Sequence, residues 1–497
     1  MSGTRSLGDM LAVSTARPKH RPWPRHSVTA ATWDDIGVAL VAGRVDLMAL
    51  FADLGEVNAV LFEPASGEVG VASILYYDGR FPSLGRLHAP AQRLERAIHD
   101  LDGLMATGAP DFRPWLDHGV WPDSRDEARL SYPFLPAIGE GLHQIPVGPV
   151  HAGIIEPGHF RFTCNGEAVV RLEERLGYVH KGIEALLAGA DLSRAARIVG
   201  RVSGDSTVAY QLAFARAVEA ATGTEPPPRA VWLRALLAEL ERVANHINDV
   251  GFVANDAAFA LLHTHCGLLR EQVLRVCGEL FGHRLMMDRI LPGGVSIELE
   301  DGGTARLRAL VTELGARFAE IAAAYDNTPS LLDRTVATGM VTGDLARRFA
   351  AGGYVGRASG RLFDSRRALA YPPYDRLVFE VAMLDRGDVD ARVRIRIREV
   401  EQSLSLVQQI LGSLPSGPVL APVRDGPGEG LALVEGFRGD VLVWVRLDAG
   451  GRVARCHPRD PSWFQWPLLE AAIEGNIVAD FPLCNKSFNC SYAGHDL

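Results

Sequence analysis

The spacing of apolar residues predicts a short mixed unit followed by a long, mainly helical one. Asn58 to Phe62 and Val69 to Tyr77 are apolar runs bounded by turn residues, as expected of two strands. A helical spacing of Leu and Ile follows over residues 94–101, and Thr32 is a candidate N-cap for an earlier helix. These elements predict a small α+β domain over residues 27–104.

The second unit begins near residue 145 and changes to helical periodicity. Residues 146–172 predict a small antiparallel sheet, with turns at Pro157-Gly158 and Asn165-Gly166. The clearest helix covers residues 228–250, where Pro228 suits the first turn and leucines form a stripe. Further helices are predicted over 255–283, 303–326 and 388–413, and strands over 431–434 and 441–447.

The remaining segments separate these units. Residues 1–26 are basic and carry no long apolar run, which indicates a disordered tail rather than a secretory signal; contact with acidic lipid or a partner is the alternative. Residues 105–144 are rich in Pro, Gly, Asp and Trp and predict a linker. The expected fold class is α+β, with the 27–104 domain followed by a large helical domain with small sheets over residues 145–497.

Composition and charge narrow the functional classes. The net charge of −9 disfavours a nucleic-acid partner. No run of about 18 uncharged apolar residues predicts a membrane span, so a membrane role would run through partner subunits or surface contact. None of the six cysteines forms a CxxC pair, which favours free thiols in a reducing compartment.

Six segments together resemble one family, the large subunits of complex I-related (group 4) nickel–iron hydrogenases of the formate hydrogenlyase and hydrogenase-4 type. They also resemble the 49-kDa-type subunit of respiratory complex I. Arg80 to Gly103 resembles the 30-kDa-type subunit, which is fused ahead of the large subunit in the hydrogenlyase-type proteins. The six segments are Gly148 to Phe162, Arg175 to Glu184, Ala235 to Gly251, Leu291 to Val295, Arg357 to Gly360 and Asp385 to Val400.

The resemblance places four nickel-binding cysteines in two CxxC pairs, and this chain has lost all four. The early positions are Ser203 and Ser206, and the late positions are Ser491 and Gly494. A neutral hydroxyl is a poor ligand for a soft metal site. Two other cysteines lie near the late pair but out of register, and they leave open a metal bound in another way; they are Cys484 and Cys490. We therefore expect no nickel–iron centre, no cofactor held by this chain, and an iron–sulfur cluster on a partner subunit.

Two interpretations of the vacated positions remain open. Ser203 and Ser206 suit the cap of a helix, or they line a polar pocket that conducts protons or faces a quinone. Asp205 stands where the family has an apolar residue, and burial would raise its pKa. His151 matches a family histidine that faces quinone in complex I, whereas the family's tyrosine has no match; Tyr210 lies four residues beyond Ser206.

The predicted site therefore has catalytic candidates Asp205, His151 and Glu184. The pocket candidates are His151, Ser203, Ser206 and Tyr210. His180 and Glu184 are spaced i, i+4 and would share one helix face. Glu184 is interpreted either as a proton carrier or as part of an ion pair.

Other polar residues have ordinary structural interpretations beside functional ones. His159 is a relay candidate or a hydrogen-bonded structural histidine. The segment His263-Thr264-His265-Cys266 does not suit zinc, because residues two apart on a helix point to different faces. No phosphate loop or GxGxxG motif supports nicotinamide binding by this chain, although the family works in NADH-linked complexes. Arg357, Asp385, Asp388 and Arg392 predict an internal ion-pair network, with a polar cavity as the alternative.

The resemblance implies a peripheral subunit of a complex I-like respiratory oxidoreductase at the cytoplasmic face of the inner membrane. Its expected partners are an iron–sulfur small subunit and integral, antiporter-like membrane subunits. Together with the small subunit it would form a metal-free pocket for quinone or proton-coupled redox chemistry, linking electron transfer to proton translocation. Whether the chain is itself an enzyme stays open. The alternatives are an active nickel–iron hydrogenase large subunit and a non-catalytic scaffold of an ion-translocating complex.

Overall fold

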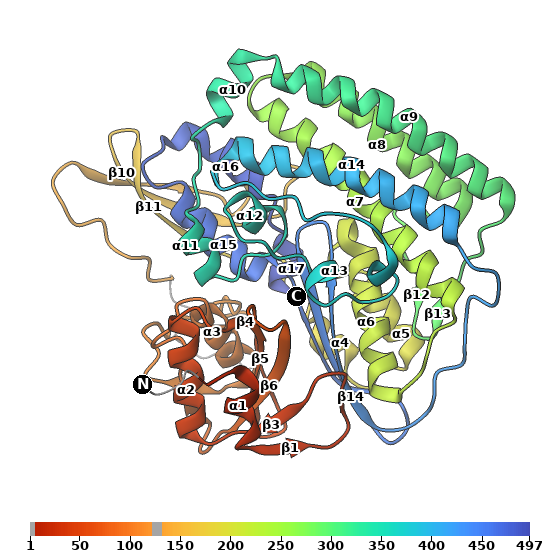
Figure 1. Ribbon diagram of the computed structural model, residues 1–497. Helices are drawn as coiled ribbons and strands as arrows, with labels where there is room; N and C mark the ends of the chain where they lie inside the picture. Colours follow the sequence, from red (N-terminus) through yellow and green to blue (C-terminus); the bar gives the residue numbers. More distant parts are fainter. Residues whose placement is uncertain (1–4, 122–131) are drawn as a thin grey trace.

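The computed structural model describes residues 5–121 and 132–497, and its N-terminal unit is built on a five-stranded sheet of order β1-β3-β6-β5-β4 (Figure 1). β4, β5 and β6 form an antiparallel meander, which β3 joins in parallel. The helices α1, α2 and α3 pack against this sheet. The elements are α1 (Leu7–Ala12), β1 (Thr15–Arg17), β2 (His20–Arg21), β3 (Arg25–Ser27), α2 (Ala30–Val41), β4 (Asp46–Asp53), β5 (Glu56–Glu63), β6 (Glu68–Leu75), β7 (Arg80–Pro82), α3 (Ala91–Asp102) and β8 (Met105–Thr107).

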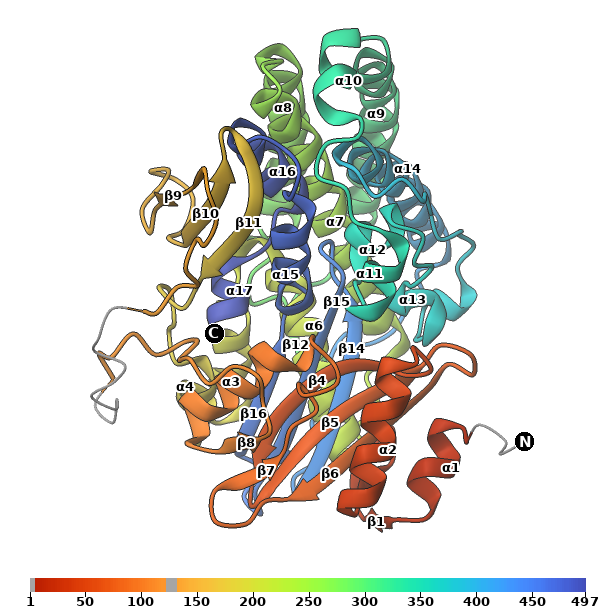
Figure 2. The same ribbon diagram turned by 90° about the vertical axis from the view of Figure 1, so that its left-hand side faces the viewer.

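The other face of the N-terminal sheet packs on a sheet from the far end of the chain (Figure 2), made of β14 (Gly428–Glu435), β15 (Asp440–Leu447) and β16 (Val453–Arg459). Phe51 and Trp444 meet across this contact with ring centroids 4.9 Å apart. Asp53 and Arg446 form an ion pair of 2.9 Å beside them. Because both faces of the N-terminal sheet are covered, β5 is buried along its whole length. The two predicted domains therefore share a hydrophobic core.

The prediction of a disordered tail is wrong for residues 5–26. Ser6 caps α1, whose Leu7 is buried, and β2 adds to β14 in parallel at the edge of the C-terminal sheet. Arg25 is buried because Glu56 receives its guanidinium at 2.6 Å. The basic residues that indicated disorder thus include ion-pair partners of a folded segment. Residues 1–4 lie outside the described residues.

The predicted N-cap of α2 and the predicted linker over residues 105–144 are also wrong in part. The N-cap of α2 is Thr29, whose side chain accepts a hydrogen bond from the main-chain N–H of Thr32. Residues 105–121 of the predicted 105–144 linker are packed, since Trp115 and Leu116 are buried, whereas none of residues 132–144 is buried. Residues 122–131 of that segment lie outside the described residues.

The large domain combines a three-stranded antiparallel sheet, β11-β10-β9, with a bundle in which α7 packs against α8 and α14. Within the parts of the chain described, no helix is long and apolar enough to cross a membrane. The sheet comprises β9 (Leu142–Val147), β10 (His159–Asn165) and β11 (Ala168–Arg175). The longer helices are α5 (Leu192–Val199), α6 (Thr207–Thr222), α7 (Pro228–Asp256), α8 (Ala260–Phe281), α9 (Asp301–Asp326), α14 (Val389–Ser413) and α15 (Ser462–Ala472). The shorter elements are α4 (Ile183–Leu187), η2 (Gly204–Ser206), β12 (Ile290–Leu291), β13 (Gly294–Val295), α10 (Pro329–Thr335), α11 (Gly343–Arg348), α12 (Gly353–Ala358), α13 (Ser365–Ala368), η3 (Tyr374–Arg376), η4 (Val478–Asp480), α16 (Phe481–Phe488) and α17 (Tyr492–Asp496).

Helix α7 lies inside this bundle and carries polar residues into it. Its Glu239, Glu241, Arg242 and His246 are all buried. Buried ionisable groups need hydrogen-bond or charge partners, and the partners of these side chains come from α6, α14 and the C-terminal sheet. Through these contacts α7 positions the polar centre of the domain.

Candidate functional site

The four vacated cysteine positions converge in the structure. Ser203 immediately precedes η2 at the entrance to α6, and Ser491 caps the last helix, α17. Their Oγ atoms lie 3.0 Å apart although the residues are separated by 288 positions. The Ser491 Oγ also accepts a hydrogen bond of 2.9 Å from the main-chain N–H of Gly494. The early and late segments therefore meet, as the resemblance implies.

An arginine occupies the space between these two segments. Arg438 lies between β14 and β15 and is 5% exposed. Its Nη1 and Nη2 donate to the two carboxylate oxygens of Asp205 at 2.9 and 2.6 Å. Nη1 also donates to Ser206 Oγ at 3.1 Å, and Nε donates to the carbonyl of Asn489 at 2.6 Å. One guanidinium thus joins the early segment to the late one.

Asp205 is held ionised by this arginine. Burial acts to raise the pKa of Asp205, but the charge and hydrogen bonds of Arg438, with a hydrogen bond of 2.7 Å from Ser203 Oγ, outweigh it and lower the pKa to about 2. The expectation of a raised pKa is therefore wrong, because the partner of Asp205, Arg438, is distant in the chain and was not predicted. Asp205 acts as a fixed negative charge at neutral pH.

The donor set at this place does not fit a nickel–iron centre. It offers serine hydroxyls where soft thiolates are needed, and the buried cation of Arg438 would repel a metal ion. A side chain at Gly494 would meet the Oδ2 of Asp460 well inside van der Waals contact. Cys490 is buried in its protonated form, since burial raises its pKa far above the ordinary value. We derive no chemistry through a metal at this place.

Tyr210 forms part of the wall around the site. It is fully buried on α6, and its hydroxyl donates to Asp460 Oδ2 at 2.6 Å. Burial and the neighbouring Asp460 raise the pKa of Tyr210 well above its ordinary value, so the phenol keeps its proton. This bond orients the carboxylate that approaches Gly494. Tyr210 is therefore a structural donor within the site.

His151 lies at the outer side of the same site, beside a tyrosine that the sequence did not single out. Its Nε2 is 3.4 Å from the hydroxyl of Tyr492, and its Nδ1 is 3.2 Å from the carbonyl of Pro149. Tyr492 directly follows Ser491, so the C-terminal segment contributes both residues. The family's early tyrosine is missing, yet a phenol stands next to the predicted histidine. Tyr492 could have been singled out in the sequence, because it directly follows Ser491, one of the vacated cysteine positions.

Glu184 has partners of its own, and no described contact joins it to the vacated positions. Its carboxylate accepts from His457 Nδ1 at 2.6 Å and pairs with Arg455 at 2.7 Å. Burial favours a higher pKa for Glu184, but its contacts with His457 and Arg455 lower it. The predicted helix face shared with His180 is wrong, because α4 begins at Ile183. Glu184 therefore belongs to a buried ion-pair group.

A second carboxyl near Asp205 was missed in the sequence. Glu241, on α7, is 6% exposed and accepts main-chain hydrogen bonds from Val208 (2.7 Å) and Ala209 (3.1 Å). Burial raises its pKa to about 8, with a smaller contribution from the charge of Asp205. Asn245 connects the two acids by donating to the main-chain carbonyls of Asp205 and Glu241 at 2.8 and 2.9 Å. An acid within the apolar stripe of residues 228–250 was the only sequence signal.

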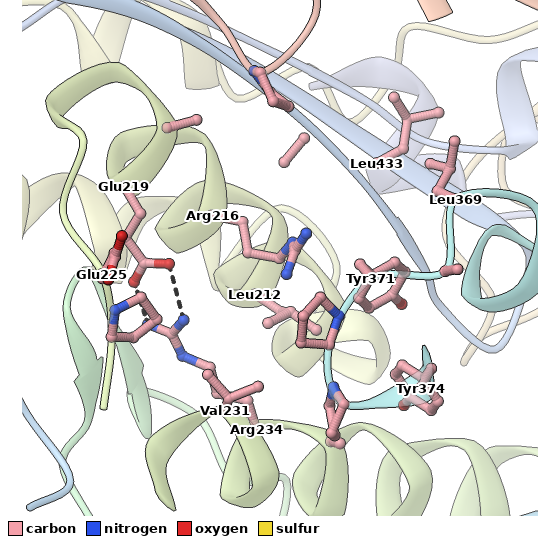
Figure 3. A pocket seen from close by; sticks show the side chains of 18 of the residues that line it. Leu212, Arg216, Glu219, Glu225, Val231, Arg234, Leu369, Tyr371, Tyr374 and Leu433 are labelled. Atoms are coloured by element: carbon pink, nitrogen blue, oxygen red, sulfur yellow. Dashed lines mark hydrogen bonds and ion pairs between the residues drawn. The ribbon is translucent and has the colours of Figure 1, made fainter. Parts of the chain in front are cut away.

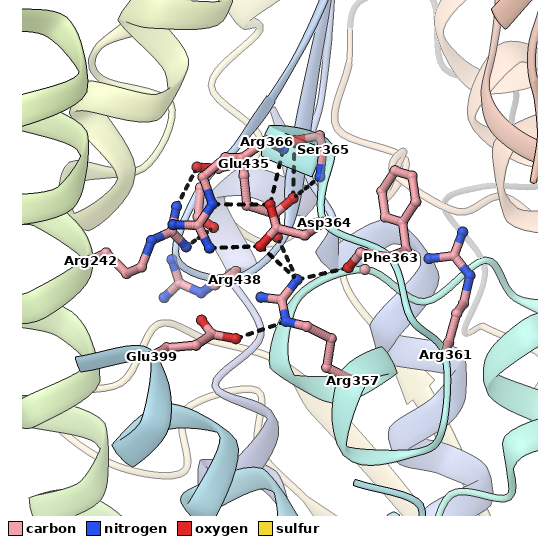
Figure 4. Close-up of polar contacts among 12 residues, drawn as sticks. Arg242, Arg357, Arg361, Phe363, Asp364, Ser365, Arg366, Glu399, Glu435 and Arg438 are labelled. Carbon is pink, nitrogen blue, oxygen red and sulfur yellow. Dashed lines mark hydrogen bonds and ion pairs between the residues drawn. The ribbon is translucent and has the colours of Figure 1, made fainter. Parts of the chain in front are cut away.

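A buried ion-pair cluster lies behind the site (Figure 4). Arg357 donates to Glu399 at 2.7 Å and to Glu435 at 2.8 Å, while Arg366 pairs with Asp364 at 2.6 Å and contacts Glu239 at 3.0 Å. Of the four residues expected in an internal network, only Arg357 is in this cluster. The other three lie apart: Asp388 caps α14, Arg392 donates to main-chain carbonyls, and Asp385 is exposed.

The remaining candidates have structural surroundings. His159 Nδ1 lies 3.3 Å from the carbonyl of Gly148, as expected of a structural histidine. Cys266 is buried and packs against Gly251 between α7 and α8. In residues 5–121 and 132–497, no group of three or more His, Cys, Asp or Glu side chains is arranged to hold a metal ion.

Comparison with known proteins identifies relatives of this chain. Residues 256–426 match the family of the 49-kDa subunit of the respiratory-chain NADH dehydrogenase. The chain is 32% identical to the carbon monoxide-induced hydrogenase of Rhodospirillum rubrum, over 70% of this chain and 97% of that protein. It is 29% identical to formate hydrogenlyase subunit 5 of Escherichia coli, over 81% of this chain and 74% of that protein.

A solved structure gives the same assignment. A chain of the membrane-bound sulfane sulfur reductase, an archaeal respiratory membrane complex, superposes with a TM-score of 0.68 at 26% identity, covering 72% of this chain and all of that one. The chain therefore belongs to the family of complex I 49-kDa-type subunits and complex I-related, group 4 hydrogenase large subunits.

Proposed function

We propose that this chain is a peripheral subunit of a complex I-like, hydrogenase-related membrane oxidoreductase, and that the vacated metal position works as a metal-free pocket for proton-coupled redox chemistry. The observation that carries the proposal is the ion pair between Arg438 and Asp205 at the meeting point of Ser203, Ser206 and Ser491. A hydrogen-bonded charge pair, with Arg438 buried and Asp205 partly exposed, preserves a polar centre where the redox metal of the hydrogenases would be.

The substrate class favoured by the site is a quinone. Reducing a quinone to a quinol takes two electrons and two protons. An iron–sulfur cluster of the partner small subunit would supply the electrons, and this chain would supply the protons. The Tyr492 hydroxyl and the His151 ring, 3.4 Å apart, are two neighbouring groups able to donate to a quinone oxygen. Glu241 holds a proton at neutral pH beside the ionised Asp205, so the two acids are separated in pKa as acid–base sites require.

Exposed apolar residues next to His151 favour a partner subunit that binds to the protein surface at this loop. Val150 and Ile154 are 80% and 90% exposed, next to His151 on the loop before β10. Exposed apolar residues on a loop suit a protein interface. By family, the partner is the iron–sulfur small subunit, with antiporter-like membrane subunits beneath it at the cytoplasmic face of the inner membrane. Proton translocation by those subunits would be the output of the redox step.

The test uses the assembled complex, a reduced dye as electron donor and a soluble quinone. We expect His151→Ala and Tyr492→Phe each to lower quinone reduction by about tenfold or more, with subunit composition unchanged. His265→Ala, an exposed histidine on α8, is the matched control and should retain full activity. Unchanged activity in both site variants would favour the scaffold alternative.

A separate measurement tests the hydrogenase alternative. An active hydrogenase large subunit would carry nickel close to one atom per chain and would oxidise hydrogen with a dye acceptor. We expect neither in the purified complex, because the donor atoms at the four family positions are hydroxyls or missing. Stoichiometric nickel together with hydrogen uptake would overturn the proposal.

A further inference from the structure

A cavity lies near the C-terminal end of α6, away from the vacated metal position at the N-terminal end of this helix. Its volume is about 630 Å³, and its walls come from α6, α7, β14 and the segment 369–374 (Figure 3). Arg216 is nine residues beyond Thr207, so the helical rise places it on the order of 14 Å along α6 from the site. Pro22 and Trp23, which follow β2, complete the wall because β2 pairs with β14.

The lining suits the apolar part of a small ligand. A volume of this size lies within the range of roughly 300–1,000 Å³ typical of small-molecule sites. Most wall residues are apolar, among them Leu212, Val231, Ala235, Leu369 and Leu433. Such a surface binds hydrocarbon and leaves specificity to the few polar groups in the cavity.

Arg216 is the polar group without a partner. Its guanidinium lies over the ring of Tyr371, with Cζ 4.6 Å from the ring centroid, within the distance of about 6 Å at which a cation is attracted to an aromatic face. Among residues 5–121 and 132–497 it makes no ion pair, and its buried Nε has no hydrogen-bond partner. Figure 3 shows the side chain inside the cavity with no interaction drawn to it. Burial lowers the pKa of Arg216, and the opposing effects of Tyr371 and Glu219 do not offset it.

The buried charged groups and the tyrosine hydroxyls of the cavity wall, apart from Arg216, are already engaged, whereas Glu225, which also lines the cavity, is exposed to solvent. Glu219 pairs with Arg234 at 2.5 Å and also accepts the main-chain N–H of Gly293 at 2.8 Å. The Tyr374 hydroxyl donates to Glu239 at 2.6 Å, and the Tyr371 hydroxyl accepts from the main chain of Glu435 at 3.1 Å. The cavity therefore combines apolar walls with a guanidinium whose buried Nε has no hydrogen-bond partner among the described residues.

We propose that this cavity binds an amphipathic organic anion, with its carboxylate or phosphate head on Arg216 and its hydrocarbon body against the apolar walls. A carboxylate or phosphate would supply the counter-charge and the acceptor that Arg216 lacks. The proposal does not depend on quinone chemistry, since neither Asp205 nor His151 borders the cavity.

The test measures direct binding to the full chain by calorimetry, with three probes that separate head from body. Dodecanoate carries both parts, acetate only the head, and 1-dodecanol only the body. We expect saturable binding of dodecanoate, with both partial probes weaker by about tenfold or more, each tenfold being about 1.4 kcal/mol. Dodecyl phosphate in place of dodecanoate distinguishes the two head groups, and tight binding of either supports the proposal.

Three variants complete the experiment. Arg216→Gln should weaken dodecanoate binding by about tenfold, and Ala220→Phe should weaken it by filling the cavity while the charge remains. Arg275→Gln, an exposed arginine on α8, is the matched control and should bind as the unaltered chain does. If dodecanol binds as tightly as dodecanoate, or if Arg216→Gln and Ala220→Phe both bind unchanged, the proposal is overturned. Because no redox partner is involved, these outcomes are independent of the quinone assay.

Discussion

The replacement Glu241→Gln should reverse its effect on stability between acidic and alkaline pH. In the unfolded chain this carboxyl releases its proton near the ordinary value of 4.5, whereas in the folded protein burial raises its pKa to about 8. Between these values the folded state binds more protons than the unfolded state. The Glu241 carboxyl therefore costs nothing below 4.5, and its cost grows as the pH rises towards 8.

The size of the effect follows from the shift. Each pH unit above 4.5 costs about 1.4 kcal/mol, so the penalty is on the order of 3 kcal/mol at neutral pH and levels off near pH 8. Glutamine removes this penalty but also removes a hydrogen-bond acceptor. Its single amide oxygen replaces two carboxylate oxygens that accept from Val208 and Ala209. Leaving one of those buried N–H groups unpaired costs roughly 1–3 kcal/mol.

The expected outcome is a change of sign. At about pH 5 the variant should be less stable than the unaltered chain by roughly 1 kcal/mol, and at about pH 8 more stable by roughly 2 kcal/mol. Urea unfolding of the full chain at a series of pH values measures the difference directly. Glu401→Gln, an exposed glutamate on α14, is the matched control and should show no such crossover. A stability difference that does not vary with pH would refute the assignment of a protonated Glu241.

The remaining predictions concern the ion pair and the vacated position. Gly494→Cys should lower the melting temperature by several degrees and bind no nickel, because the new Cβ meets Asp460; thermal unfolding and metal analysis check both. Asp205→Asn should destabilise the chain by roughly 1–2 kcal/mol in urea unfolding, because it removes the negative charge paired with the buried Arg438, and the partial exposure of Asp205 reduces the effect below that of a fully buried pair. The stability that Asp205 contributes is present above its ordinary pKa of 3.8 and is lost as the pH falls towards about 2, so unfolding of Asp205→Asn should vary less with pH in that window.

The long helices could be predicted because their periodicity is local. The patterns over 255–283, 303–326 and 388–413 correspond to α8, α9 and α14. β4 was missed because its residues are buried on both faces, which removes the alternation that marks a strand. The cover on one of those faces comes from β14 and β15, almost 400 residues later in the chain. No local pattern contains that information.

The candidate site also contains features that could be predicted and features that could not. The convergence of Ser203 with Ser491 was implied by the family resemblance, because the two segments carry the paired ligands in the hydrogenases. The partner of Asp205 was not implied, because Arg438 lies in a short connection with no helical or strand period. Glu241 was hidden by its own helix, where an acid in an apolar stripe suggests no partner until α6 is placed against it. Electrostatic surroundings are tertiary properties, and the pKa values of both Asp205 and Glu241 depend on them.

The loss of the cysteines and the presence of Asp205 are connected by charge balance. Arg438 is buried, and a buried guanidinium without an anion is strongly destabilising. Thiolates around a metal would place negative charge near it, whereas the hydroxyls of Ser203, Ser206 and Ser491 are neutral. Asp205 restores one negative charge with two parallel hydrogen bonds to the guanidinium. The same pairing keeps Asp205 ionised and unable to carry a proton at neutral pH. Under the proposed function, Glu241 rather than Asp205 is therefore the acid beside the ion pair that could exchange a proton near neutral pH, because burial raises its pKa to about 8.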